Sequence, residues 1–490
     1  MKRIKTFVVL AVCLLLCSST VYAQSPYLSF DDTEWNSSAT APEGYEAANS
    51  WLGIECGTTP FVEPNDLCMD DKGQMYVLDS GNDRVVILDT DMQMVGDIKK
   101  LTHPDGTASS FNESRGICVD SEGNLYVADT SNSRVIKMDI KGNVLQQYLR
   151  PNNSAYTSKV FRPLRVSVDG NGMVYVAAEG VYQGLLLYKN NGDFHSFFGS
   201  APVDVTAQLL IERLWKQILN RQMRDTQARY VPIEYASLDM DADGMVYTVS
   251  AYSKTQQEQV RKLNYLGNNI YPYQKNFGES ETVYHKGSKW ISTFVDVAVD
   301  SEDYVFVLDS TRCRVYMFDA EGNRLCVFGT KGEQMGSLRN PVSMTVFEES
   351  VNVLDRSKGS ITCFTPSEYG SRIREAVTHY NDGRYEQAAS AWKTLLSYNA
   401  NLELAYCGLG EAMLKSGEYK AAVEYFRQGY DRERESVAFG MYRNQLLRQN
   451  APVLIALLVL VVVVLALLTS RSFLGFVNRK WKNRKRGEHR

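Results

Sequence analysis

A recurring unit that predicts short β-strands is the feature that most limits how this chain can fold. The six copies lie at residues 73–89 and 123–139, around Tyr175 and Tyr247, at residues 303–319 and around Val353. Internal repetition of this kind is typical of architectures in which one structural unit packs on the next. A flat open sheet with this many strands would be unusual.

Each unit has the pattern of strands joined by tight turns. Residues 75–78 form a continuous apolar run, as expected of a buried strand. Residues 79–82, Asp-Ser-Gly-Asn, have turn chemistry, and residues 85–88 form the next apolar run. A second turn with glycine and a further strand follow in the clearer copies. Three or four short strands, repeated six times, predict a mainly β chain that closes into a β-propeller.

The units resemble NHL repeats over roughly residues 62–365. The fifth unit carries the resemblance best, with a strand, an Asp turn, an Arg-Val strand, a Gly turn and Phe-Gly over residues 305–329. The resemblance implies a six-bladed NHL-type β-propeller over residues 62–365. Units three, four and six lack the arginine, and residues 51–56 are the candidate strand for closing the ring. The recurring Asp79, Asp129, Asp309 and Asp355 are interpreted as turn caps.

An insertion near residues 203–229 interrupts the propeller pattern. Leu210, Leu214 and Ile218 recur at helical spacing, which predicts an amphipathic helix. Such a helix is expected to pack on the propeller as a lid or brace, and the alternative is a surface that docks a partner. Trp215, Glu234 and Tyr235 are the candidate partner-binding residues of this region.

After residue 365 the period changes to a helical one. Gly383, Tyr385, Ala388 and Trp392 are matched 34 residues later by Gly417, Tyr419, Ala422 and Phe426. This spacing resembles tetratricopeptide repeats, so residues 366–449 are predicted to hold about two such repeats and a capping helix over 436–448. Trp392 is expected to be buried and is a further candidate for partner binding.

Both ends of the chain predict export and membrane anchoring. Residues 1–23 have the basic start, short apolar run and small residues of a cleaved signal peptide. Residues 24–61 would then form an N-terminal extracytoplasmic segment. Residues 450–470 are apolar and uncharged over a length that can cross a bilayer, with Pro452 expected in the first turn of the helix. The tail, 471–490, carries eight Lys and Arg, so the positive-inside rule places it in the cytoplasm.

Charge and cysteine content exclude some classes of function. Outside the predicted signal and tail, 42 Lys and Arg face 56 Asp and Glu, which disfavours nucleic acid as a partner. Seven cysteines remain after signal cleavage, and none forms a CxxC pair or a metal-type cluster. We therefore expect no cofactor.

The sequence contains no catalytic constellation that we can identify. The five histidines fall in no zinc-binding spacing, and no nucleophile elbow, P-loop or dinucleotide fingerprint occurs. No catalytic, metal or cofactor residue is therefore predicted. An enzyme is not expected, and the minority alternative is a metal-dependent lactonase- or esterase-like propeller.

The combination of exported propeller, inserted helix, tetratricopeptide pair and anchor resembles uncharacterised bacterial NHL-repeat proteins that accompany sugar ABC transporters. The resemblance implies a membrane-anchored extracytoplasmic binding or scaffold protein. Its expected partners are proteins, including transporter components, or glycans near an envelope or carbohydrate-uptake system. The rival hypothesis is an envelope sensor that signals through its cytoplasmic tail.

Overall fold

The computed structural model describes residues 29–32, 38–156, 158–199, 234–250, 259–271, 277, 283–285, 288–290 and 292–487. The chain divides into two compact units, Met1–Arg374 and Glu375–Arg490, each described here by itself. The predicted signal peptide and the predicted helical insertion, including Trp215, lie outside the described residues.

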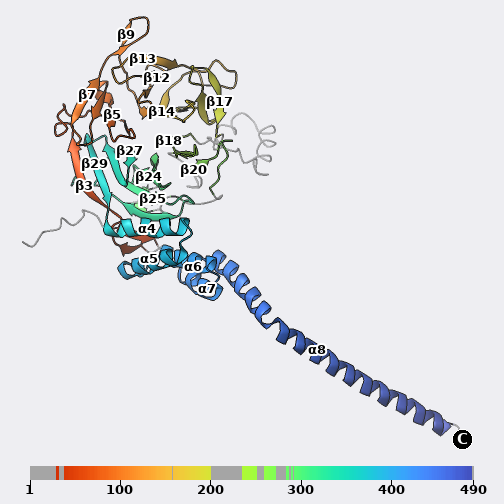
Figure 1. Ribbon diagram of the computed structural model, residues 1–490. Helices are drawn as coiled ribbons and strands as arrows, with labels where there is room; N and C mark the ends of the chain where they lie inside the picture. Colours follow the sequence, from red (N-terminus) through yellow and green to blue (C-terminus); the bar gives the residue numbers. More distant parts are fainter. Residues whose placement is uncertain are drawn as a thin grey trace, which may run out of the picture. The chain divides into compact units, whose positions relative to one another are not determined.

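The first unit is a six-bladed β-propeller, which confirms the predicted fold (Figure 1). Blade 1 comprises β4 (Asp66–Met69), β5 (Met75–Asp79), β6 (Arg84–Leu88) and β7 (Met94–Ile98). Blade 2 comprises β10 (Gly116–Val119), β11 (Leu125–Asp129), β12 (Arg134–Met138) and β13 (Val144–Tyr148). Blade 3 comprises β14 (Pro163–Val168), β15 (Val174–Ala178), β16 (Leu185–Tyr188) and β17 (Phe194–Phe198).

The remaining blades follow the same antiparallel order. Blade 4 has three strands among the described residues, β18 (Ser237–Met240), β19 (Val246–Val249) and β20 (Val260–Leu263). Blade 5 comprises β23 (Phe294–Val299), β24 (Val305–Asp309), β25 (Arg314–Phe318) and β26 (Arg324–Phe328). Blade 6 comprises β27 (Pro341–Phe347), β28 (Ser350–Asp355), β29 (Ser360–Pro366) and β3 (Tyr45–Leu52). Outside the blades lie the short pairs β1 (Ser29–Asp32) with β2 (Ser38–Ala41), β8 (Leu101–Thr102) with β9 (Ala108–Ser109), and β21 (Val283–His285) with β22 (Ser288–Trp290).

The ring is closed by a strand from the N-terminal side of the repeats. β3 pairs antiparallel with β29, from Leu52 opposite Ser360 to Tyr45 opposite Pro366. The closing strand was predicted at residues 51–56 and actually lies at Tyr45–Leu52, because the chain turns at residues 53–57. The inner strands β4, β10, β14, β18, β23 and β27 contact one another in cyclic order, which leaves a channel at the centre.

The hydrophobic core lies between neighbouring blades rather than within a single layer. Tyr76, Tyr126 and Tyr247 stand on the second strand of their blades and are almost completely buried. The hydroxyl groups of Tyr126 and Tyr247 reach Asp120 and Asp241 at 3.2 and 3.1 Å. Most tyrosines of the repeats therefore fill the blades, with their polar end satisfied by a turn aspartate.

The recurring aspartates at the ends of the second strands hold turns, as predicted. Asp309 Oδ1 accepts hydrogen bonds from the backbone N–H groups of Thr311 and Arg312 in its own turn, and from Thr293 in the preceding loop. Asp79 accepts a hydrogen bond from the N–H of Val62 in the preceding loop at 2.7 Å. Its other oxygen lies 2.8 Å from Arg84 Nε, and both side chains are buried. Each aspartate thus ties the turn of its blade to the chain that enters the blade.

An ion pair secures the start of the first helix within the propeller unit. Arg374, in the N-terminal half of α4 (Glu368–Asn381), is buried and lies 2.8 Å from the buried carboxylate of Asp300. Its guanidinium also stacks over the ring of Tyr304, 4.3 Å from the centroid. Glu302 lies 2.9 Å from the same guanidinium, and these partners together compensate the cost of burying the charge.

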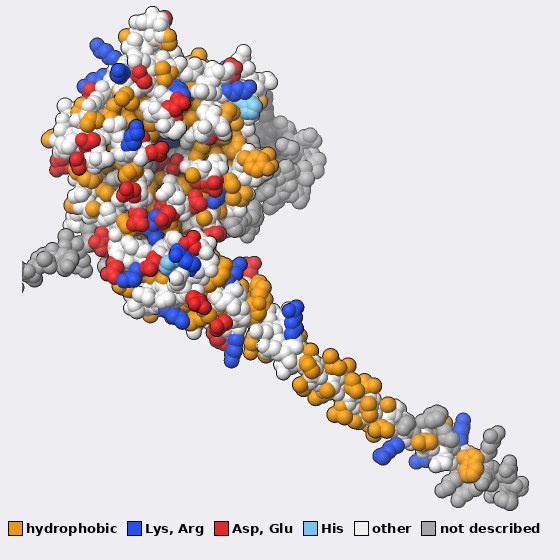
Figure 2. Space-filling model, viewed as in Figure 1, with side chains coloured by type: hydrophobic (Ala, Val, Ile, Leu, Met, Phe, Trp, Pro, Cys, Tyr) orange, Lys and Arg blue, Asp and Glu red, His pale blue; other side chains and the backbone are white. Residues whose placement is uncertain are grey.

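The second unit is helical and carries one long apolar helix. It contains the end of α4, then α5 (Tyr385–Tyr398), α6 (Glu403–Lys415), α7 (Tyr419–Gln428) and α8 (Arg432–Gly487). The predicted capping helix, span and most of the tail are continuous in α8. Figure 2 shows a band of hydrophobic side chains along this helix. Among the described residues it is one helix with the length and composition to cross a membrane.

The expectation for Pro452 was wrong. Pro452 lies inside α8 and not in the first turn of a helix. The helix is continuous there because the chain upstream, from residue 432, is already helical. Proline has no N–H, so Pro452 cannot donate the usual hydrogen bond to the carbonyl of Arg448.

Trp392 gives a direct test of packing in the helical unit. Its side chain is 3 % exposed, and a Cβ atom built on Gly408 of α6 would lie 2.5 Å from its ring. Trp392→Ala should lower the free energy of unfolding of this unit by about 3–5 kcal/mol. Hydrogen exchange of α5 and α6 measures the change. The exposed Tyr398→Ala is the control, and equal exchange in both variants would contradict the packing.

Candidate binding site in the central channel

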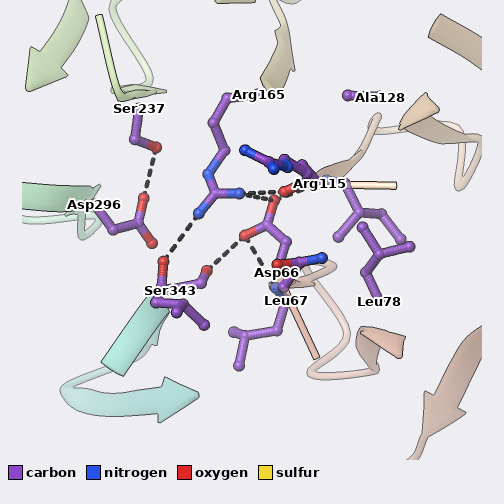
Figure 3. A network of polar contacts seen from close by, with 12 residues as sticks. Asp66, Leu67, Leu78, Arg115, Ala128, Arg165, Ser237, Asp296 and Ser343 are labelled. Carbon is purple, nitrogen blue, oxygen red and sulfur yellow. Dashed lines mark hydrogen bonds and ion pairs between the residues drawn. The ribbon is translucent and has the colours of Figure 1, made fainter. Parts of the chain in front are cut away.

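One residue from each inner strand stands at the same register position around the channel. Each pairs with the residue two places beyond the recurring aromatic position of its blade. The six are Asp66, Gly116, Arg165, Ser237, Asp296 and Ser343. We call them the polar ring. Five of them, all except Gly116, bear charges or hydroxyls that interact across blade boundaries (Figure 3).

The two carboxylates of the polar ring are held by neighbouring blades. Asp66 accepts hydrogen bonds from Ser343 Oγ at 2.5 Å, from the N–H of Ile117 at 2.8 Å and from the N–H of Leu67 at 3.1 Å. Asp296 accepts one bond from Ser237 Oγ at 2.6 Å and one from the N–H of Met344 at 2.7 Å. Every oxygen of both carboxylates therefore already accepts a hydrogen bond.

Arg165 extends across the channel. It belongs to blade 3, and its Nη2 donates to the carbonyl of Val342 in blade 6, on the opposite side of the ring, at 2.9 Å. Its Nη1 donates to the carbonyl of Arg115 and lies 3.6 Å from Asp66 Oδ2. Figure 3 shows the guanidinium between Asp66 and the strand of Ser343.

The ring accommodates this arginine partly because residue 116 is glycine. A Cβ atom on Gly116 would lie 2.7 Å from the carbonyl oxygen of Leu164 and 2.8 Å from Cα of Arg165. Both distances are too short for a real carbon. A side chain at this position would therefore displace β14, the strand that carries Arg165.

A second ring lies two residues further along the inner strands. Cys68, Cys118 and Asp239 pair with Tyr76, Tyr126 and Tyr247 of their blades and are partly open to the channel. Asp239 accepts a hydrogen bond from the N–H of Val299 at 2.9 Å. Burial raises the pKa of Asp239 to about 7 and raises the pKa of both thiols well above the usual range. The thiols therefore stay protonated, which makes them poor nucleophiles.

The channel does not fit a divalent metal ion. Among the described residues, no group of three His, Cys, Asp or Glu side chains is placed to hold one. The carboxylate of Asp66 faces the guanidinium of Arg165, so the position that would suit a cation already holds a positive charge. Each oxygen of Asp296 accepts one hydrogen bond, from Ser237 Oγ or from the N–H of Met344.

Of the residues predicted from the sequence for partner binding, Trp215 lies outside the described residues, and the other three are not members of the polar ring. Tyr235 is buried in blade 4, where its hydroxyl donates to the carbonyl of Gly199 and accepts a bond from Arg261. Glu234 is partly exposed, and its hydrogen bond with Tyr182 raises the pKa of that phenol. Trp392 is buried in the helical unit. Their role in binding a partner stays a prediction.

The sequence analysis missed the polar ring, although a signal for it exists. Five of its members stand ten residues before the aromatic position of their unit, as Asp66 does before Tyr76 and Arg165 before Tyr175. An alignment of the six units on that position would have put these polar residues in one column. Their mutual pairing would still have required the closed ring.

Comparison with known proteins finds one family model that matches part of the propeller and several solved structures of low sequence identity. Residues 55–163 match the family model described as SMP-30/Gluconolactonase/LRE-like region. No curated protein matches the chain. The similar solved structures include virginiamycin B lyase from Staphylococcus aureus, with 8 % identity, a TM-score of 0.41, and coverage of 65 % of this chain and 99 % of that chain.

Two further solved structures are similar at the same level. The calcium-binding protein regucalcin from Agrobacterium tumefaciens has 10 % identity, a TM-score of 0.39, and coverage of 63 % of this chain and 91 % of that chain. A protein of unknown function from Bacteroides thetaiotaomicron has 10 % identity, a TM-score of 0.41, and coverage of 67 % of this chain and 73 % of that chain. Similarity this distant does not transfer an activity to the present chain.

The raised pKa of Asp239 predicts a pH dependence of stability. The folded protein holds the proton of this carboxyl up to a pH of about 7, whereas an unfolded Asp releases it at about 4. The native state therefore binds more protons in this window, and the free energy of unfolding should fall as the pH rises through it. Asp239→Asn buries no charge and keeps an oxygen for the N–H of Val299, so its stability should fall less.

Urea unfolding midpoints between pH 4 and pH 8 measure this effect. The matched control is Asp243→Asn, an exposed residue in the turn after β18, which should keep the wild-type dependence on pH. Identical pH profiles for Asp239→Asn and the wild type would show that this carboxyl is ionised as readily in the folded chain as in the unfolded one.

Proposed function

We propose that this chain is a membrane-anchored extracytoplasmic binding protein whose propeller recognises a partner. The observation that carries the proposal is the hydrogen-bonded polar ring, in which Arg165 bridges the channel and each oxygen of Asp66 and Asp296 accepts a hydrogen bond. Hydrogen bonds between neighbouring blades hold such a surface in a fixed shape, which suits recognition.

The same observation weighs against the hydrolase alternative. A lactonase- or esterase-like propeller needs a metal ion or an available carboxylate to activate water. The carboxylates of the polar ring hold neighbouring blades together, and the neutral thiols of Cys68 and Cys118 are poorly suited to covalent chemistry. Asp239 of the second ring, whose pKa burial raises to about 7, is the carboxyl group that the hydrolase alternative would use. The family model matched at residues 55–163 keeps the hydrolase as the alternative to be tested.

The anchor and the partner form the second part of the proposal. α8 supplies a helix of suitable length and composition, and the basic residues that follow its apolar stretch favour a cytoplasmic tail. The resemblance of the chain to bacterial NHL-repeat proteins that accompany sugar ABC transporters supports a transporter component or a glycan as the partner. The resemblance of the helical unit to tetratricopeptide repeats supports a protein-binding role for it as well.

A turnover assay separates binding from hydrolysis. The full-length protein in detergent should hydrolyse neither lactones nor simple esters when calcium or zinc is added, because the described residues include no group of three His, Cys, Asp or Glu side chains placed to hold the metal ion. Heat-denatured protein is the control for background hydrolysis. Metal-dependent turnover that is abolished by Asp66→Asn would overturn the proposal in favour of the enzyme.

Crosslinking in native membranes identifies the partner. We expect mass spectrometry to recover permease or solute-binding subunits of a carbohydrate-uptake system attached to the propeller. Protease added outside intact cells should remove the propeller and spare a tag fused after Arg490. Recovery of only a cytoplasmic regulator, bound to residues 471–490, would instead support the sensor hypothesis.

A further inference from the structure

Three arginines from three different blades meet where the channel opens beside the polar ring. Arg165 lies on the inner strand of blade 3, Arg115 just before the inner strand of blade 2, and Arg356 in the turn between β28 and β29 of blade 6. The contacts with Asn65 and Asp66, at the start of blade 1, bring the three together. We call them the arginine cluster.

Hydrogen bonds fix this convergence. Arg356 Nη2 donates to Oδ1 of Asn65, and Nδ2 of Asn65 donates to the carbonyl of Ser114, next to Arg115, at 3.0 Å. Arg165 donates to the carbonyl of Arg115 and faces Asp66. Asn65 therefore connects Arg356 to the loop of Arg115, while Arg165 reaches the same loop from the channel.

The cluster has more hydrogen-bond donors than the described residues can satisfy. The Nε atoms of Arg165 and Arg356 are buried, and neither has a hydrogen-bond acceptor among the described residues. Arg115 is exposed, and no hydrogen bond or ion pair of its guanidinium occurs within the described part of the chain. Buried donors in native proteins are mostly paired, and a bound water or ion is one kind of partner that accounts for those without a protein acceptor.

The local charge balance is positive. Asp66 offsets Arg165, and Glu63 is the acidic group that acts on Arg356. Burial lowers the pKa of Arg356, and the charges of Arg115 and Arg165 lower it further, each with a larger effect than the opposing effect of Glu63. The cluster is thus a positive spot on an external region in which acidic residues outnumber basic ones.

We propose that the arginine cluster binds an oxyanion of the ligand, a carboxylate or a phosphate group, at the mouth of the channel. The planar guanidinium group presents paired N–H donors that match two oxygens of such a group. An oxyanion at this place supplies acceptors for the unsatisfied donors of Arg165 and Arg356 and neutralises the charge that the three arginines bring together. This inference rests on the proposed binding function and specifies the chemistry that the propeller recognises.

Titration calorimetry at low ionic strength tests the inference on the full-length protein in detergent. The probes are inorganic phosphate, galacturonate as a sugar that bears a carboxylate, and galactose as its neutral counterpart. We expect phosphate or galacturonate to bind and galactose not to bind. Added salt should weaken the binding, since the interaction is electrostatic. The anion that binds more tightly identifies the class of oxyanion.

Two variants assign the binding to the cluster. Arg115→Gln removes an exposed side chain and should leave the fold intact, and Arg356→Gln removes a partly buried donor. Each should weaken anion binding by about tenfold or more, because one charged pair of hydrogen bonds is lost. The control is Arg162→Gln, which removes an arginine that pairs with Glu179 on the blade 3 side.

The outcomes separate this inference from the proposed function. If neither anion binds, or if Arg115→Gln binds both as tightly as the wild type does, the arginine cluster is not an anion site. Recovery of a transporter partner by crosslinking in that case would leave the general binding function standing. Loss of both anion binding and partner recovery in Arg115→Gln would link the site to the partner.

Discussion

The ladder between β3 and β29 is the interaction on which the propeller depends. It joins positions such as Ser50 and Thr362, whose hydroxyls meet at 3.2 Å although they are 312 residues apart. Without this ladder the last blade would lose its outer strand, and β29 would become the exposed edge of the blade. The inner strands would then no longer be held at the spacing at which Asp66 meets Ser343, or Arg165 meets Val342.

Two charged residues of the channel have a structural role in the propeller. Asp66 and Asp296 each receive hydrogen bonds from the next inner strand around the ring, so they staple neighbouring blades together. A carboxylate used in this way is held in a fixed position by the blade beside it. Arg165 is different. Asp66 compensates its charge only in part, and its Nε has no hydrogen-bond acceptor among the described residues.

The sequence was sufficient to predict the blades because each unit repeats the same local chemistry. The buried aromatic residue, the turn aspartate and the glycine turn recur, as at Tyr76, Asp79 and Gly142. The closing strand β3 belongs to no repeat, and only its pairing with β29 defines it, so its position was misjudged. The polar ring was not predicted, for a related reason. The residue at the ring position differs from blade to blade, and the contacts of the ring join distant parts of the chain. Neither property can be recognised within one unit.

During synthesis of the chain, the closing strand β3 is made long before the strand with which it pairs. β3 is made before any blade, and its partner β29 follows roughly 300 residues later, an interval of roughly 15–60 s at ordinary rates of elongation. During that time the strand has no partner, and its backbone N–H and C=O groups can form hydrogen bonds with other chains. The middle of the strand, residues 46–50, is Glu-Ala-Ala-Asn-Ser, whose small and polar residues do not favour aggregation. A strand of this composition has a low tendency to aggregate while it is unpaired. It becomes part of a stable sheet only after β29 has been made and pairs with it.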